Sequence, residues 1–191
     1  MNIEKYFRER VGELRLASSS GDPWIFLCAS AFIEYLAKMA NGSPVDAKGY
    51  KEFLRTRFFT VCPQYSSFKY ATGGSDLADQ MYHVLRCGIV HSFSLFTDSA
   101  GRKHGGRDRS ILLAHRKSAQ GRPHLAHIVD RRRRPQLDAA LLIAEDFVED
   151  IAKVTDDLFA ESKKRTPAGR DLRKNIRTWV LNYPPIGSLI V

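Results

Sequence analysis

Residues 74–91, Gly74-Ser-Asp-Leu-Ala-Asp-Gln-Met-Tyr-His-Val-Leu-Arg-Cys-Gly-Ile-Val-His91, carry the pattern that decides the fold. Ser75 or Asp76 offers a side-chain acceptor to the first free backbone amides, and Asp79 lies one turn further, where the helix dipole favours a carboxylate. The apolar residues recur every three or four positions; they are Leu77, Met81, Val84, Leu85, Gly88 and Ile89. This spacing predicts a capped helix with one buried face.

Two side chains suited to phosphate chemistry, Arg86 and His91, lie near the end of this predicted helix. They are five residues apart, which is about 140° around an ideal helix of roughly 3.6 residues per turn. They therefore share one narrow face only if the helix ends or deforms near His91, although they can border the same cleft.

The string Arg86-Cys-Gly-Ile-Val-His91 fits an Arg-x(4–6)-His pattern and resembles the HEPN superfamily, in particular its uncharacterised bacterial branch. The resemblance implies a helical bundle, a homodimer that brings two such helices together, and endoribonuclease activity that needs no metal. In that activity His91 would take the proton of a ribose 2′-hydroxyl, and Arg86 would bind the phosphate and stabilise its developing charge. The strongest family versions have a polar residue directly after the arginine, where this chain has Cys87.

A structural role for the same two residues stays open. Arg86 can pair with a carboxylate such as Asp79 or Glu34, and Glu34 is the one unusual charge on an otherwise apolar predicted helix. His91 can close the helix C-terminus, where the dipole favours a cation. The alternative function is then a non-catalytic, HEPN-like interaction or regulatory protein that binds a partner protein or nucleic acid.

The net charge of +9 comes entirely from residues 101–135, which hold eleven lysines and arginines against Asp108 and Asp130. Eight of these bases are the predicted nucleic-acid contacts: Arg102, Lys103, Arg107, Arg109, Arg131, Arg132, Arg133 and Arg134. Such a segment attracts phosphate backbones, and the scarcity of aromatic residues within it favours binding that does not depend on base sequence. The alternative is a solvated basic loop without a partner.

Composition bounds the remaining possibilities. A chain of 191 residues with 43% hydrophobic residues predicts one domain, 1–191, with an inserted basic segment at about 92–135. The sequence begins without an apolar signal core, and its longest apolar run, 24–33, is too short to cross a bilayer, so we expect a cytoplasmic protein without membrane contact.

Three cysteines without a Cys-x-x-Cys pair argue against disulfides and structural zinc. The glycine-rich residues 101–106 lack the ending of a nucleotide-binding loop, and no cofactor is predicted.

The rest of the chain predicts a mainly α protein, a HEPN-like helical bundle with a small basic β-hairpin insertion. Hydrophobic periodicity and cap residues predict the other helices at 3–16, 23–40, 46–58, 137–162 and 168–181, with a loop at 61–74. Residues 110–116 and 123–129 are expected to form the hairpin, with Gly121 in its turn, and 92–97 a third short strand. The helix at 137–162 has an acidic exterior that includes Asp150.

The sequence does not favour a metal site. His83 and Cys87 lie one turn apart on a helix but lack an evident third ligand, and a strand would point His124 and His127 to opposite faces. The other histidines considered as ligands with that second pair are His104 and His115.

Overall fold

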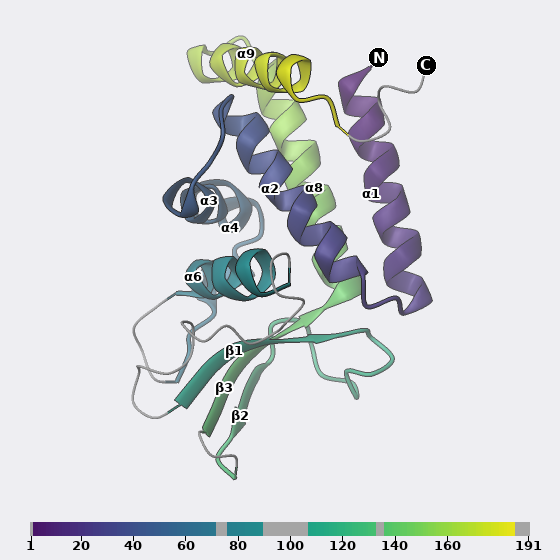
Figure 1. Cartoon of the computed structure of the whole chain (residues 1–191), viewed down its shortest axis with the longest axis vertical. Helices are drawn as coiled ribbons and strands as arrows, with labels where there is room; N and C mark the ends of the chain where they lie inside the picture. Colours follow the sequence, from purple (N-terminus) through teal and green to yellow (C-terminus); the bar gives the residue numbers. More distant parts are fainter. Residues whose placement is uncertain (1, 72–75, 90–106, 133–135, 186–191) are drawn as a thin grey trace.

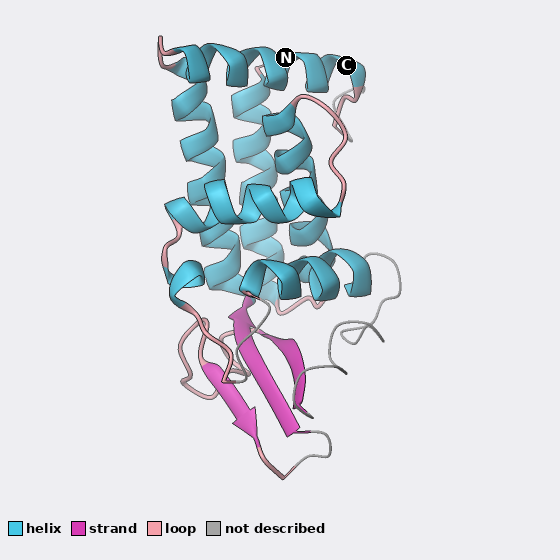
Figure 2. Cartoon of the chain, turned by 90° about the vertical axis from the view of Figure 1, so that its left-hand side faces the viewer, coloured by secondary structure: helices cyan, strands magenta, loops and turns pink. Residues whose placement is uncertain are grey.

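The computed structural model describes residues 2–71, 76–89, 107–132 and 136–185, and for 88, 89, 107–109 and 136 the backbone alone. The described residues form a bundle of helices with a small sheet at one end (Figures 1 and 2). The prediction of a mainly α protein with a small β insertion is therefore confirmed.

The long helices make up most of the bundle. They are α1 (Ile3–Ser20), α2 (Ile25–Asn41), α8 (Ala144–Lys163) and α9 (Pro167–Asn182). Helices α1, α2 and α8 run along one another, and α9 crosses the end of the bundle away from the sheet (Figure 1). Helix α2 begins at Ile25, two residues after the predicted start at 23, and the Asp22 carboxylate accepts a hydrogen bond from the Trp24 amide at 2.9 Å in the turn that precedes it.

The segment 46–67 is helical almost throughout, as α3 (Ala47–Phe53), η1 (Leu54–Phe58), α4 (Phe59–Val61) and α5 (Gln64–Ser67). Asp46 caps α3 through the Gly49 amide, and the prediction of a helix at 46–58 is confirmed. The prediction of a loop at 61–74 is wrong for α5, because the Pro63 carbonyl accepts hydrogen bonds from the next turn and so starts a new helix.

The helix predicted within residues 74–91 is present as α6 (Leu77–Met81) followed by η2 (Tyr82–Ile89). The Asp76 side chain accepts a hydrogen bond from the Asp79 amide at 3.0 Å, as the capping pattern predicts. The change from α-helical to π-helical winding at Tyr82 was not predicted. It lies within the stretch that carries Arg86.

The sheet consists of β1 (Arg107–Ala114), β2 (His127–Asp130) and β3 (Gln136–Ile143), in the order β1-β3-β2. Strand β3 is the centre, parallel to β1 and antiparallel to β2. The predicted pairing of 110–116 with 123–129 is therefore wrong. Gly121 does adopt a left-handed turn conformation with φ 74°, but that turn joins strands that do not pair with each other. The strand expected at 92–97 lies outside the described residues.

The prediction that one helix covers 137–162 is wrong in its first part, which is β3. Leu137 to Ile143 are all buried, so the strand is apolar on both faces and its sequence has no alternating pattern. One face, with Ala140 and Leu142, joins the main core of the bundle, while Leu141 and Ile143 pack with Ala119 in a smaller cluster. A continuous apolar run of this kind fits a helix and a buried strand equally well.

Among the helices of the described part of the chain, we find none whose length and apolar character would let it cross a membrane.

Candidate functional site

Arg86 lies in the π-helical segment η2, which packs against α2. A π-helix closes its hydrogen bonds between residues five apart, so such residues lie almost above one another instead of about 140° apart. Arg86 and His91 can share one face only if the helix ends or deforms. Such a deformation, the π-helical winding, is present up to Ile89, the last described residue of η2. His91 itself lies outside the described residues.

The Arg86 guanidinium binds the Glu34 carboxylate of α2 with two of its nitrogens, at Nε to Oε2 3.2 Å and Nη2 to Oε1 3.3 Å. The Lys38 ammonium, one turn along α2, lies 2.7 Å from Oε1 of the same carboxylate. All three side chains are largely buried, with 14% of Glu34, 28% of Lys38 and 26% of Arg86 exposed. We call these three residues the Glu34 cluster. It holds two cations for one carboxylate and therefore keeps a net positive charge.

The ion pair between Glu34 and Arg86 shifts the pKa of both groups in favour of their charged forms. Burial raises the pKa of Glu34, but hydrogen bonds from Lys38 and Arg86 and their positive charges outweigh it, so the pKa is lower than usual. Burial lowers the pKa of Arg86, and the hydrogen bond to Glu34 more than restores it. The paired carboxylate therefore fixes the plane of a permanently charged guanidinium.

Asp79, the other carboxylate considered as a partner of Arg86, is engaged elsewhere. Its Oδ1 lies 3.0 Å from the Lys51 ammonium and 3.4 Å from Nη2 of Arg55. The Tyr82 ring faces cations as well, with Lys51 Nζ at 5.7 Å and Arg86 Cζ at 6.0 Å from its centroid. The surface beside the Glu34 cluster thus adds a further lysine and an aromatic face to the same region.

The basic residues predicted to contact nucleic acid are described only in part. Arg131 and Arg132 are exposed, directly after β2, and the Asp130 side chain fixes this turn by accepting a hydrogen bond from the Arg132 amide at 2.9 Å. Arg107 and Arg109 belong to β1, but their side chains lie outside the description. Arg102, Lys103, Arg133 and Arg134 fall outside the described residues altogether.

Within the described ranges, no three histidine, cysteine, aspartate or glutamate side chains come together in a way that could hold a metal ion. Of the histidines considered as ligands, His104 lies outside the described residues and the others are dispersed. His115 Nδ1 lies 3.0 Å from the Ser18 carbonyl, and His124 and His127 contact different carboxylates. His83, whose pKa is lowered by burial and by the charge of Lys51, is half-buried on η2.

A second polar cluster, which the sequence did not predict, surrounds Asp150 of α8. This residue was expected on the exterior of the helix, yet it is only 3% exposed. Gln64 Nε2 donates to Oδ2 at 3.0 Å, and Lys153 Nζ donates to Oδ1 at 2.8 Å. His124 Nε2 lies 3.7 Å from Oδ2. We call Asp150, Gln64, Lys153, His124 and Tyr65 the Asp150 cluster.

The ring of His124 has a defined tautomer in this cluster. The Ile143 amide donates to its Nδ1 at 3.0 Å, so Nδ1 is the acceptor and Nε2 carries the proton toward the Tyr65 hydroxyl at 2.9 Å. Burial lowers the pKa of His124, which favours this neutral form. Burial, followed by the nearby Asp150 charge, raises the pKa of Tyr65. Both ring nitrogens of His124 are thus hydrogen-bonded to groups of the fold itself.

Asp138 of β3 makes a separate pair that sequence reasoning also missed. It is 0% exposed, and its Oδ1 lies 2.6 Å from Nε2 of His127 on the neighbouring strand β2. The Ala71 amide donates to the same oxygen at 3.3 Å, and the Phe68 ring packs edge-on against His127. This pair joins the sheet to the segment before α6. No spacing signal could have shown it, because the two residues meet only through the pairing of β2 with β3.

Comparison with known proteins adds no relative: the chain matches no protein-family model, and neither a curated protein nor a solved structure is significantly similar to it.

Proposed function

We propose that this protein is a HEPN-like, RNA-binding homodimer that cleaves RNA without a metal, with Arg86 and His91 as its catalytic residues. The observation that carries the proposal is the Glu34 cluster, in which one carboxylate holds two cations and leaves positive charge beside a π-helical turn. π-Helical segments are frequent at functional sites, because they shift side chains out of α-helical register.

The chemistry follows from the two side chains. The imidazole of His91 titrates near neutrality and takes the proton from a ribose 2′-hydroxyl, whose oxygen then attacks the adjacent phosphorus. The Arg86 guanidinium stabilises the charge that develops on the phosphate oxygens. The bond to the 5′-oxygen breaks, and the products are a 2′,3′-cyclic phosphate and a 5′-hydroxyl. Glu34 acts as a positioning residue, because it orients Arg86 without contacting substrate.

The dimer is part of the proposal because the reaction has two proton transfers. One His91 removes the 2′-hydroxyl proton, and the departing 5′-oxygen needs a proton from a second group. A second copy of the chain supplies another Arg86 and His91 across the same cleft.

A second candidate function is binding without cleavage, as a HEPN-like interaction or regulatory protein with a nucleic acid or protein partner. The observation in its favour is that Glu34 already pairs with Arg86, the structural role that the sequence left open. Cys87 also stands where the strongest family versions have a polar residue. The exposed Arg131 and Arg132 supply charge for nucleic-acid binding in either case.

Incubation of the full-length protein with end-labelled single-stranded RNA in EDTA separates the two candidates. We expect cleavage that leaves cyclic phosphate ends, and a rate that falls by roughly 100-fold or more in Arg86→Ala and in His91→Ala. Arg15→Ala is the matched control, because Arg15 also pairs with a glutamate on another helix, at 2.7 Å and 2.8 Å. It should cleave within about twofold of the wild type.

Cleavage that persists in both Arg86→Ala and His91→Ala would overturn the catalytic assignment. Retention of RNA by the wild type without any cleavage supports the second candidate instead. Sedimentation of the wild type as a monomer at the concentrations that cleave RNA would contradict the shared site.

A further inference from the structure

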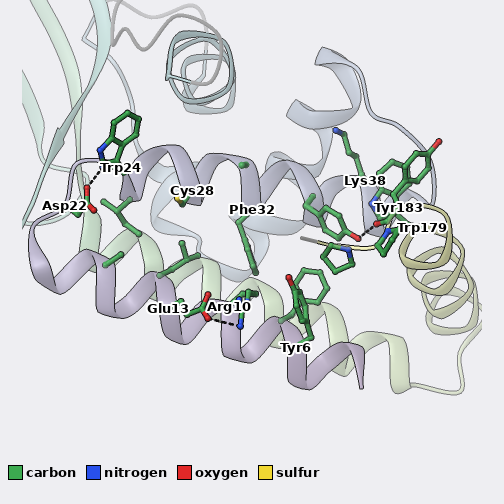
Figure 3. Close-up of a pocket in the computed structure, with 18 residues that line it drawn as sticks. Tyr6, Arg10, Glu13, Asp22, Trp24, Cys28, Phe32, Lys38, Trp179 and Tyr183 are labelled. Carbon is green, nitrogen blue, oxygen red and sulfur yellow. Dashed lines mark hydrogen bonds and ion pairs between the residues drawn. The ribbon is translucent and has the colours of Figure 1, made fainter. Parts of the chain in front are cut away.

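A groove of about 660 Å³ runs between α1 and α2, on the side of α2 that faces α1, and ends at α9 (Figure 3). Its lining is mainly apolar and aromatic, and includes Phe7, Leu14, Phe32 and Trp179. Four charged residues line it as well: Arg10 and Glu13, which pair at 2.7 Å, and Asp22 and Lys38. A groove of this size and lining is suited to an apolar occupant.

The two ends of the groove are marked by aromatic side chains. Trp24, at the start of α2, is 55% exposed, and Tyr183, just after α9, is 52% exposed. The Tyr35 hydroxyl donates to the Tyr183 carbonyl at 2.7 Å and so holds the chain against the groove as it leaves α9 (Figure 3). Pro184 and Pro185 follow as part of the wall, and Pro185 is buried.

The residues that follow Pro185 have the composition of an occupant. Residues 186–191, Ile-Gly-Ser-Leu-Ile-Val, contain four large aliphatic side chains and no charge, and they lie outside the described part of the chain. Six extended residues reach at most about 20 Å, while the α2 wall from Trp24 to Tyr35 is roughly 16 Å long. The segment is therefore long enough to lie along the groove from the Pro185 end.

We propose that the groove between α1 and α2 binds residues 186–191 of the same chain. Tethering favours this occupant over a free ligand, because a short connection gives an effective concentration in the millimolar range. Contact between four large aliphatic side chains and an apolar groove removes both surfaces from water, which favours binding. The inference does not rest on the proposed RNA binding, although the two sites share one residue, because Lys38 of the Glu34 cluster also lines the groove.

The test uses intrinsic fluorescence, because both tryptophans of the chain, Trp24 and Trp179, line the groove. The variant is Leu189→Asp with Ile190→Asp in the full chain. Leu181→Asp is the control, since Leu181 is an 81% exposed leucine on α9 outside the groove lining. We expect the double variant to bind a hydrophobic dye severalfold more strongly, to quench more readily with acrylamide, and to melt roughly 4–8 °C lower.

Unchanged dye binding and unchanged quenching in the double variant, relative to Leu181→Asp, would overturn the proposal. If the wild type is a dimer and the double variant a monomer by sedimentation, the segment occupies a second copy instead, which also overturns it. The expected fluorescence changes with the same oligomeric state in the wild type and the double variant support binding within one chain. Since the assay contains no RNA, its outcome is separate from that of the cleavage experiment.

Discussion

The Glu34 cluster and the Asp150 cluster each gather hydrogen-bond donors around one carboxylate, but they differ in charge and in access to solvent. Glu34 is paired with two cations whose side chains are about one quarter exposed. Asp150 is 4% exposed as a side chain and is surrounded by a glutamine, a neutral histidine, a tyrosine and one surface lysine. The first arrangement leaves positive charge for a ligand, whereas the second satisfies its own buried polar groups.

The difference in charge and exposure between the two clusters shows that a carboxylate with several partners is not by itself a sign of function. Around Asp150 the partners come from α5, α8 and the segment before β2, so the cluster joins three parts of the chain. Around Glu34 the partners lie on α2 and η2, which already pack through apolar residues. We therefore expect the Asp150 cluster to matter more for stability and the Glu34 cluster to matter more for ligand binding.

The largest expected effect on stability is that of Asp150→Ala. The substitution leaves the buried Tyr65 hydroxyl and the more exposed Gln64 amide without this acceptor, and should lower the free energy of unfolding by about 3 kcal/mol. Denaturant titration measures it. Asp156→Ala on the same helix is the control, because Asp156 is 60% exposed and its pair with Arg8 should contribute less than about 1 kcal/mol. Equal losses in the two variants would contradict the distinction between the clusters.

Glu34→Ala should have the next largest effect. It leaves Lys38 and Arg86 close together without their acceptor, in a partly exposed position, and should cost about 1.5 kcal/mol of unfolding free energy. Glu149→Ala serves as control, since Glu149 is 49% exposed and pairs only with Arg15 among the ion pairs described. The same variant should retain RNA at least as well as the wild type while cleaving it more slowly. A gain in cleavage would show that Glu34 does not position Arg86.

Much of the fold could be predicted from the sequence, because amphipathic helices and their caps are local features. Asp76, for example, caps the helix that its position predicts. Strand β3 could not be predicted, since Leu137 to Ile143 are buried on both faces and so carry no period that distinguishes strand from helix. The strand pairing then failed as well, because β1 and β2 meet β3 and not each other.

In the candidate sites, too, the contacts that could be predicted differ from those that depend on the fold of the sheet. The pairing of Arg86 with Glu34 was one of two alternatives that the sequence left open, because a lone carboxylate on an apolar helix calls for a cation. The roles of Asp138 and Asp150 were not predicted. Their partners, His127 and His124, lie 11 and 26 residues away in the sequence and reach them only once the sheet has formed.

A smaller effect is expected from the pH dependence of the Asp150 cluster. Burial lowers the pKa of His124 below its usual 6.5, so the unfolded chain takes up a proton at a higher pH than the folded one does. Stability should therefore fall as the pH drops from about 6.5 through the lowered pKa, and it should be unaffected above that range. His124→Gln keeps a donor and an acceptor but cannot titrate, and should flatten this decrease.

The control for the pH experiment is His115→Gln, which should retain the decrease in stability. Some slope should remain in His124→Gln, because burial also lowers the pKa of His83. A profile of free energy of unfolding against pH that is identical in His124→Gln and the wild type would show that the ring is not held neutral by its surroundings.

The smallest effect on stability, within about 0.5 kcal/mol, is expected for replacement of Arg131 to Arg134 by glutamine, because Arg131 and Arg132 are exposed surface residues. RNA retention should nevertheless weaken, and the slope of log affinity against log salt should decrease by up to about 3, since each phosphate contact releases counterions. The comparison is sharpest between about 50 mM and about 200 mM salt. Lys163 and Lys164, also exposed, provide the control pair as glutamines. Retention that does not change with salt in the wild type would contradict electrostatic binding, and an equal loss in the lysine control would show that only total charge matters and not the basic segment after β2.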